Sequence, residues 1–306
     1  MTEQPPLYNI GPFRSSSKNT DTQLNVYVSN KQFTIDLFTA NFESSSVLLA
    51  EYLQRVQRLD PEYIPNNTDE DEECEDPLDQ MHDWILQPFL PIFRKLAPLD
   101  QSQKYTLEDC LFAEEFHYTV QAMKESLVPV FLNSFKVKKN HLIGAHLPSS
   151  TCVDYSMFPV YNLNEIQVSI DANSTSLPAV PRKVFIHGRP NLSFFKIVYR
   201  GDAGITMRKL LAYSKIHTAK FNATVRTSRL DGLVKNDNGY VMGLLLSYID
   251  SCGTTLYCID GRDPNGDAYL IDFGGGYTRD WVEKEMVNSI DGDLQGLENI
   301  KRHLLE

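Results

Sequence analysis

The chain has 306 residues, of which 42% are hydrophobic and 23% are charged, and its formal net charge is −11. This size and balance are typical of a globular protein with one large domain or two smaller ones. The acidic charge disfavours a nucleic-acid or anionic-lipid partner, and no stretch approaches the roughly 18 apolar residues of a membrane span.

The cysteines and the N-terminus favour a cytoplasmic protein with reduced thiols. The five cysteines form an odd set without a CxxC pair: Cys74, Cys110, Cys152, Cys252 and Cys258. A disulfide framework or a zinc module needs closer and more regular spacing. The first residues, Met-Thr-Glu-Gln-Pro-Pro, show no basic region followed by an apolar run, so no secretory signal is visible.

The first half of the chain is predicted to be a flexible leader followed by a helical extension. Residues 1–30 are rich in Ser, Thr, Asn and Pro, which favours a loose leader. Residues 31–150 are predicted to be mainly helical, because apolar residues recur at helical spacing from Thr34 onward. The acidic run 69–76 has like charges that repel and lacks the glycine turn of a calcium loop, so we expect a solvated loop.

Two more helices are expected in this extension. The stretch from Met81 to Leu96 is apolar at helical spacing and should be bent or broken at Pro88 and Pro91. Thr106 begins Thr-Leu-Glu-Asp, close to a capping box, and predicts a long amphipathic helix that runs to Leu127. The histidines in and beyond these helices lack a metal-like partner set and are interpreted as structural: His82, His117, His141 and His146.

Residues 151–306 change to short β-type runs and define the second domain. Strands are predicted at 166–170, 183–187, 194–199 and 223–225, with a helix at 205–220 and a further apolar run at 240–249. Strands, one helix and then more strands is an order found in many α+β domains. The fold class is therefore predicted to be α+β.

The most specific motif is a strand from Ala268 that ends in Asp272-Phe273-Gly274, after a turn at 263–266 and before a helix-like tail. In kinases the Asp of this motif binds the Mg²⁺ that bridges the nucleotide phosphates. The stretch from Ile271 to Leu297, together with 82–84, 87–93 and 105–112, resembles a fungal protein-kinase-like family. The resemblance covers most of the chain after about residue 30.

This resemblance implies a protein-kinase-like fold with a five-stranded-type N-lobe, a truncated C-lobe and the N-terminal helical extension. Lys196, centred in an apolar strand, takes the place of the phosphate-contacting lysine, although an exposed edge strand would equally explain a lysine there. The run 240–249 matches the strand that leads into the interlobe hinge. The implied cofactor-binding residues are Lys196, Ser247, Asp250, Asp272, Phe273 and Gly274, with Asp272 as the metal ligand.

Three departures from the kinase pattern argue against catalysis, and no catalytic residue is assigned. Only residues 251 to 271, 21 in all, separate Asp250 from Asp272, which leaves no room for two helices and a catalytic loop. The helix predicted at 205–220 contains no acidic residue to pair with Lys196. No glycine-rich phosphate loop precedes Lys196.

We therefore expect a catalytically impaired, pseudokinase-like protein that binds or scaffolds a protein partner or a small ligand. It would have no phosphotransferase activity and at most weak affinity for ATP and Mg²⁺. The truncated C-lobe would expose a surface suited to self-association. Two alternatives stay open: an ATP-dependent phosphotransferase whose catalytic-loop segment is missing from the gene model, and an accessory protein in a fungal secondary-metabolite pathway.

Overall fold

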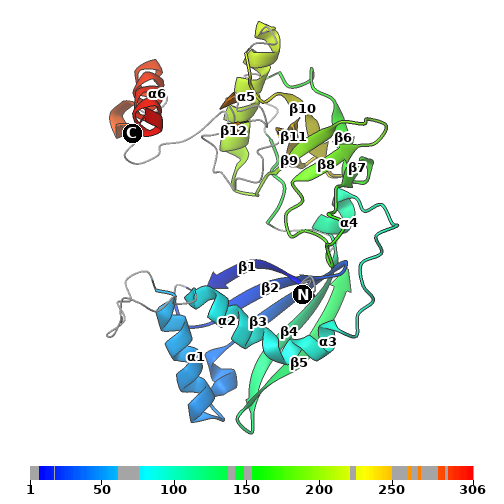
Figure 1. Ribbon diagram of the computed structural model, residues 1–306, viewed down its shortest axis with the longest axis vertical. Helices are drawn as coiled ribbons and strands as arrows, with labels where there is room; N and C mark the ends of the chain where they lie inside the picture. Colours follow the sequence, from blue (N-terminus) through cyan, green and yellow to red (C-terminus); the bar gives the residue numbers. More distant parts are fainter. Residues whose placement is uncertain are drawn as a thin grey trace. The chain divides into compact units, whose positions relative to one another are not determined.

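The chain divides into two compact units, each of which combines a sheet with helices (Figure 1). Unit 1 comprises Met1–Asn140 and Val168–Pro181, and unit 2 comprises His141–Gln167 and Arg182–Glu306. The prediction of an α+β protein is confirmed. The computed structural model describes residues 7–16, 18–60, 76–136, 142–147, 154–220, 225–249, 261–262, 268–269, 282–286 and 289–305.

Unit 1 is built on a five-stranded sheet in the order β1-β2-β3-β4-β5. Its strands are β1 (Asn9–Ser15), β2 (Thr22–Val28), β3 (Lys31–Leu37), β4 (Glu114–Met123) and β5 (Ser126–Lys136). Neighbouring strands are antiparallel except β3 and β4, which run parallel. Parallel neighbours need a long crossover, and the segment between β3 and β4 carries the helices of this unit.

Within its described residues, 38–60 and 76–113, the crossover contains six helical segments, and local side chains set the limits of several of them. These are η1 (Thr39–Phe42), α1 (Ser46–Arg58), α2 (Pro77–Leu86), η2 (Gln87–Phe89), α3 (Leu90–Phe93) and α4 (Leu107–Leu111). The Ser45 hydroxyl caps α1 by accepting from the Leu48 N–H at 3.3 Å. Pro88 and Pro91 lie in the first turns of η2 and α3, so the predicted break of the Met81–Leu96 stretch is confirmed.

The core of unit 1 lies between one face of the sheet and the helical segments η1, α1, α2, η2 and α3 (Figure 1). Leu24 and Val26 of β2 and Ile35 of β3 alternate with polar residues, and all three are fully buried. The prediction of a loose leader over residues 1–30 is therefore wrong, because β1 and β2 lie within that range. The prediction that helical structure begins at Thr34 is also wrong, since β3 runs to Leu37.

The helix predicted from Thr106 to Leu127 is correct only at its first turn. The capping box forms, with the Thr106 N–H donating to the Asp109 carboxylate at 2.8 Å, but α4 ends at Leu111. Strands β4 and β5 follow, joined by a two-residue turn at Lys124 and Glu125. Within β4, Phe116, Tyr118, Val120 and Ala122 alternate toward the core, so period two prevails over the helical spacing.

Unit 2 contains a six-stranded sheet in the order β6-β10-β11-β9-β8-β7. Its elements are β6 (Val160–Asn162), η3 (Leu163–Glu165), β7 (Ile166–Val168), β8 (Lys183–Ile186), β9 (Leu192–Ile197), α5 (Ala203–Ala219), β10 (Leu230–Lys235) and β11 (Val241–Ser247). The strands and helix predicted between Ile166 and Tyr199, at 205–220 and at 240–249 are confirmed within a few residues. The fourth strand begins at Leu230, beyond the predicted 223–225, of which only Val225 is described.

Helix α5 covers one face of this sheet. Leu210 and Tyr213 are its buried anchors, and they belong to a core with Leu233 of β10 and Leu244 of β11. The Tyr213 and Ser228 hydroxyls lie 3.0 Å apart and satisfy each other within this core. The interior of unit 2 is therefore organised around β11, in the middle of the sheet.

The rest of unit 2 is described in shorter pieces. These are β12 (Gly261–Arg262), β13 (Ala268–Tyr269), η4 (Lys284–Met286) and α6 (Ile290–Leu305). β12 and β13 form an antiparallel pair, and α6 confirms the predicted helical tail. None of the helices in the described part of the chain is long and apolar enough to cross a membrane.

Candidate functional site

Lys196 lies on a central strand of unit 2. It pairs with Leu244 of β11, and β9 itself lies between β8 and β11, so the exposed-edge explanation for this lysine is wrong. Side chains alternate along a strand, which puts Lys196 on the face of Phe194 and Val198. Both neighbours pack in the core that α5 covers, and Lys196 is half-buried. The lysine therefore belongs to the helix-covered face of the sheet.

Helix α5 presents no carboxylate to this lysine. The residues from Ala203 to Ala219 include no Asp or Glu, and Thr206, Leu210 and Tyr213 are the ones buried. In active protein kinases a Glu from the corresponding helix pairs with the lysine and orients it. Helix α5 therefore does not supply that pairing group.

Ser247, at the end of β11, uses its backbone N–H and its hydroxyl in hydrogen bonds to Arg229, next to the start of β10. Its N–H donates to the Arg229 carbonyl at 2.9 Å, and its hydroxyl accepts from the Arg229 N–H at 2.9 Å. These bonds fix the start of β10 against the end of β11. Ser247 therefore lies at the strand end that was expected to meet an adenine, with its N–H already bonded.

Asp250, Asp272, Phe273 and Gly274 lie outside the described residues, as do most of the acidic run 69–76 and four of the five cysteines. Cys110 is buried, and burial raises the pKa of its thiol. Within the described residues, no group of three or more His, Cys, Asp or Glu side chains could hold a metal ion.

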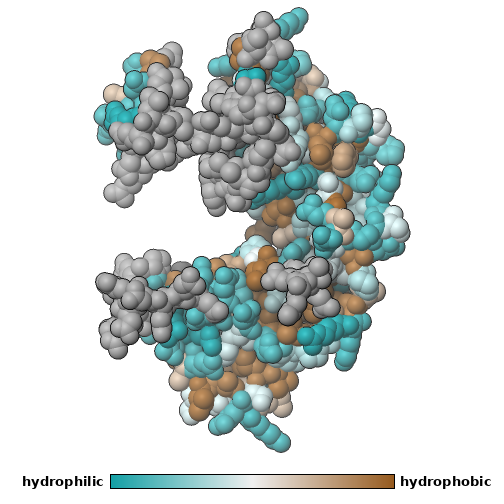
Figure 2. Space-filling model, in the orientation of Figure 1, coloured by the Kyte–Doolittle hydropathy of each residue, from teal (hydrophilic) through white to brown (hydrophobic). Residues whose placement is uncertain are grey.

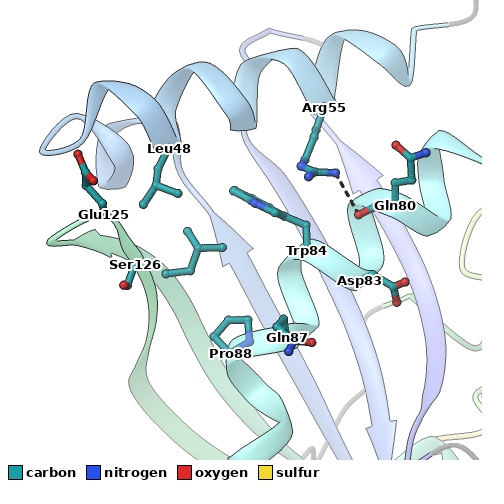
Figure 3. A pocket seen from close by; sticks show the side chains of 10 residues that line it. Leu48, Arg55, Gln80, Asp83, Trp84, Gln87, Pro88, Glu125 and Ser126 are labelled. Atoms are coloured by element: carbon teal, nitrogen blue, oxygen red, sulfur yellow. Dashed lines mark hydrogen bonds between the residues drawn. The ribbon is translucent and has the colours of Figure 1, made fainter.

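A second candidate site lies wholly within unit 1. It is a groove of about 630 Å³ between α1, the junction of α2 and η2, and the β4–β5 turn (Figure 3). We call it the α1–α2 groove. Leu48, Trp84, Pro88 and Leu127 supply its apolar surface. Its volume falls within the usual range of ligand sites, roughly 300–1,000 Å³.

A stack of planar groups fixes the position of Trp84. The Phe42 and Tyr52 rings are 4.6 Å apart with an angle of 10° between their planes, and the Trp84 ring lies about parallel to Tyr52 at 6.1 Å. The Arg55 guanidinium lies 5.4 Å from the centre of the Trp84 ring. Because aromatic neighbours and a cation hold the indole, this part of the groove is formed before any ligand binds.

Tyr52 ties that stack to the sheet. Its hydroxyl donates to the Thr20 carbonyl at 2.6 Å and lies 3.2 Å from the Thr22 hydroxyl. Burial raises the pKa of Tyr52 to about 12, so the phenol stays protonated and keeps donating at neutral pH. The rear of the groove is therefore anchored to β2.

The charges of the groove are unevenly compensated. Arg55 pairs with Glu51 one helical turn earlier at 2.8 Å and also donates to the Gln80 carbonyl at 3.3 Å. Asp83 and Glu125 are exposed, and within the described residues neither carboxylate makes a hydrogen bond or ion pair. Figure 3 shows Glu125 at the end beside the β4–β5 turn and Asp83 at the opposite end, beyond Trp84.

The opposite face of the unit 1 sheet carries a polar network that sequence reasoning missed. Glu115 accepts from the Thr34 hydroxyl and lies 2.7 Å from His117 Nε2, and Thr34 also lies 3.2 Å from the Asn25 amide oxygen. A hydroxyl has one proton, and Thr34 donates it to the Glu115 carboxylate. Asn25 therefore satisfies Thr34 best with its side-chain amide flipped, so that the nitrogen takes the place of the oxygen and donates to the Thr34 hydroxyl. The alternation Glu115–His117 would have signalled a shared strand face had β4 been predicted.

Comparisons with known proteins leave the family open. No family model matches the chain, and neither a curated protein nor a solved structure matches it.

Proposed function

We propose that this protein is a catalytically silent, kinase-like binding or scaffold protein, with unit 2 as its kinase-like N-lobe. The observation that carries the proposal is the placement of Lys196. It lies on β9, which follows the strands β7 and β8 on its side of the sheet, whereas the earlier strand β6 lies at the far edge beside β10. The helix α5 follows β9 and covers the face of Lys196. Protein kinases carry their phosphate-contacting lysine on the third strand of the N-lobe and follow it with a helix.

Two further features support a silent site over an active one. α5 offers no acidic residue to orient Lys196, and the 21 residues between Asp250 and Asp272 are too few for a catalytic loop with its preceding helices. Positioning and electrostatic stabilisation supply nearly all of phosphoryl-transfer catalysis, so losing these groups removes it. In this proposal the site would bind nucleotide weakly and with little dependence on Mg²⁺.

Titration with a fluorescent ATP analogue, with and without Mg²⁺, tests the nucleotide part of the proposal. Weak binding should fall further in Lys196→Met and stay unchanged in Lys215→Met, a control on the exposed side of α5. Tight binding that requires Mg²⁺ would contradict a silent site. Binding unaffected by Lys196→Met would contradict the assignment of the lysine.

An assay for phosphate transfer tests the catalytic part. Highly purified protein should not transfer the γ-phosphate of ATP above background to itself or to added protein. Transfer that is abolished by Asp272→Ala would instead support a true phosphotransferase. Sequencing the transcript across the codons for residues 251 to 267 then decides whether a catalytic-loop segment is missing from the gene model.

A further inference from the structure

The α1–α2 groove combines an apolar floor with unpaired carboxylates at its two ends. Leu48 and Trp84 reach into it from α1 and α2, and Pro88 lies along its side (Figure 3). Figure 2 shows apolar surface in this part of unit 1, where α1 and the β4–β5 hairpin meet. Trp84, Pro88 and Leu127 remain partly exposed in the groove, and apolar surface that stays accessible in a hollow is typical of an interaction site.

The charge of the groove indicates which kind of ligand it favours. The Arg55 charge is compensated by Glu51, whereas neither Asp83 nor Glu125 forms an ion pair with a lysine or arginine among the described residues. The local field is therefore negative, and the whole chain has a net charge of −11. Both favour the approach of a basic segment and disfavour an acidic one.

The geometry favours a short stretch of polypeptide over a compact cation. A single small cation could meet the carboxylate at one end but would leave the apolar floor exposed. An extended segment can place one bulky apolar side chain on the floor and a basic residue toward each end. Trp84 is held by Tyr52 and Arg55 before binding, so little ordering cost falls on the protein.

We propose that the α1–α2 groove binds a segment of a partner protein in which a large apolar residue is flanked by lysines or arginines. Leu48, Trp84 and Leu127 would contact the apolar side chain. Asp83 and Glu125 would meet the flanking basic groups. This site belongs to unit 1 alone and does not depend on the kinase-like proposal for unit 2.

The test uses the full chain with Trp281→Phe, which leaves Trp84 as its single tryptophan. Three peptides serve as probes: acetyl-Gly-Lys-Gly-Phe-Gly-Lys-Gly-amide, its Lys→Glu counterpart and its Phe→Ala counterpart. The Lys-Phe peptide should shift Trp84 emission and bind at least about tenfold more tightly than either counterpart. Calorimetry with the unsubstituted chain checks that Trp281→Phe has not altered the affinity.

Charge reversal then assigns the carboxylates. Asp83→Lys with Glu125→Lys should reverse the preference, so that the Glu-Phe peptide binds more tightly than the Lys-Phe peptide. Glu108→Lys with Asp171→Lys changes two exposed acids elsewhere in unit 1 by the same total charge and should leave the preference unchanged. The proposal is overturned if the three peptides are indistinguishable up to about 1 mM, or if both double variants act alike.

Discussion

The sheets of the two units bury their strands in different ways, and this difference explains which of them can be recognised from sequence. β11 lies mid-sheet in unit 2, and every residue from Val241 to Leu246 is buried, so it reads as a continuous apolar run. β2 of unit 1 buries Leu24 and Val26 but interleaves them with Gln23 and Asn25. Its composition resembles a polar leader, and only its alternation reveals a strand.

The hairpins of the two units also differ in how clearly the sequence indicates them. In unit 2 the turn between β10 and β11 uses Asn236 to accept from two backbone N–H groups and Gly239 at a φ of +77°. In unit 1 the turn between β4 and β5 places Lys124 and Glu125 at φ values of +48° and +60°. Turns with two positive φ values ordinarily use Asn and Gly, so the second hairpin gives no sequence signal.

The largest expected effect tests the role of β2. Leu24→Ala should lower the free energy of unfolding by about 2–5 kcal/mol, because the side chain is fully buried between the sheet and the helices. Ile10→Ala, at a residue that is 41% exposed on β1, should cost far less. Chemical denaturation measures both. Equal and small losses of unfolding free energy in the two variants would mean that residues 1–30 form a loose leader.

The second effect tests how tightly the middle of the unit 2 sheet is packed. A Cβ at Gly243 would lie 2.8 Å from the Lys196 carbonyl oxygen and still closer to the Phe195 ring. Gly243→Ala should therefore destabilise the protein by about 1–3 kcal/mol. Gly201→Ala, where nothing lies within 4 Å, should change stability by less than about 0.5 kcal/mol. Similar melting temperatures for the two variants would contradict the close approach of β9 and β11.

These cases show how much of the fold and site the sequence could predict. Apolar runs and a capping box predicted β9, α5, β11 and the start of α4, because burial on both faces and local hydrogen bonds leave local patterns. The placement of Lys196 on a central strand, and not at an edge, depends on strand order, which no local pattern specifies. The α1–α2 groove needs Leu48, Trp84 and Glu125, brought together from three elements by the parallel pairing of β3 and β4.

A smaller effect tests the turn of unit 1. Replacing Lys124 by Asn and Glu125 by Gly should stabilise the protein by about 1–2 kcal/mol, because these residues adopt positive φ at lower cost. The reverse experiment in unit 2, Gly239→Glu, should destabilise it. Denaturant titration gives both values. A loss of stability in the Asn-Gly variant would mean that the Lys124 and Glu125 side chains contribute more than their backbone geometry costs.

The last prediction concerns a buried histidine that has no counterpart among the described residues of unit 2. His82 on α2 is 5% exposed, and its ring packs against the Phe13 ring in a T-shaped arrangement with the ring centres 5.7 Å apart. Neither of its ring nitrogens has a hydrogen-bond partner. Burial lowers the pKa of His82 below its usual 6.5, although Asp79, Asp83 and Asp76 oppose the shift. The folded state therefore resists a proton that the unfolded chain accepts.

Because the unfolded state binds more protons, stability should fall as the pH drops below about 6.5 and stop falling once the folded-state pKa is passed. Above pH 6.5 neither state holds the proton, so His82 should contribute no pH dependence there. His82→Leu removes two unsatisfied nitrogens and keeps the site apolar, so it should cost little at pH 8 and flatten the acid limb. Denaturation midpoints of both proteins between pH 4.5 and 8 measure this. If the variant loses stability with acid as steeply as the parent does, the buried imidazole is not the group that makes unit 1 sensitive to acid.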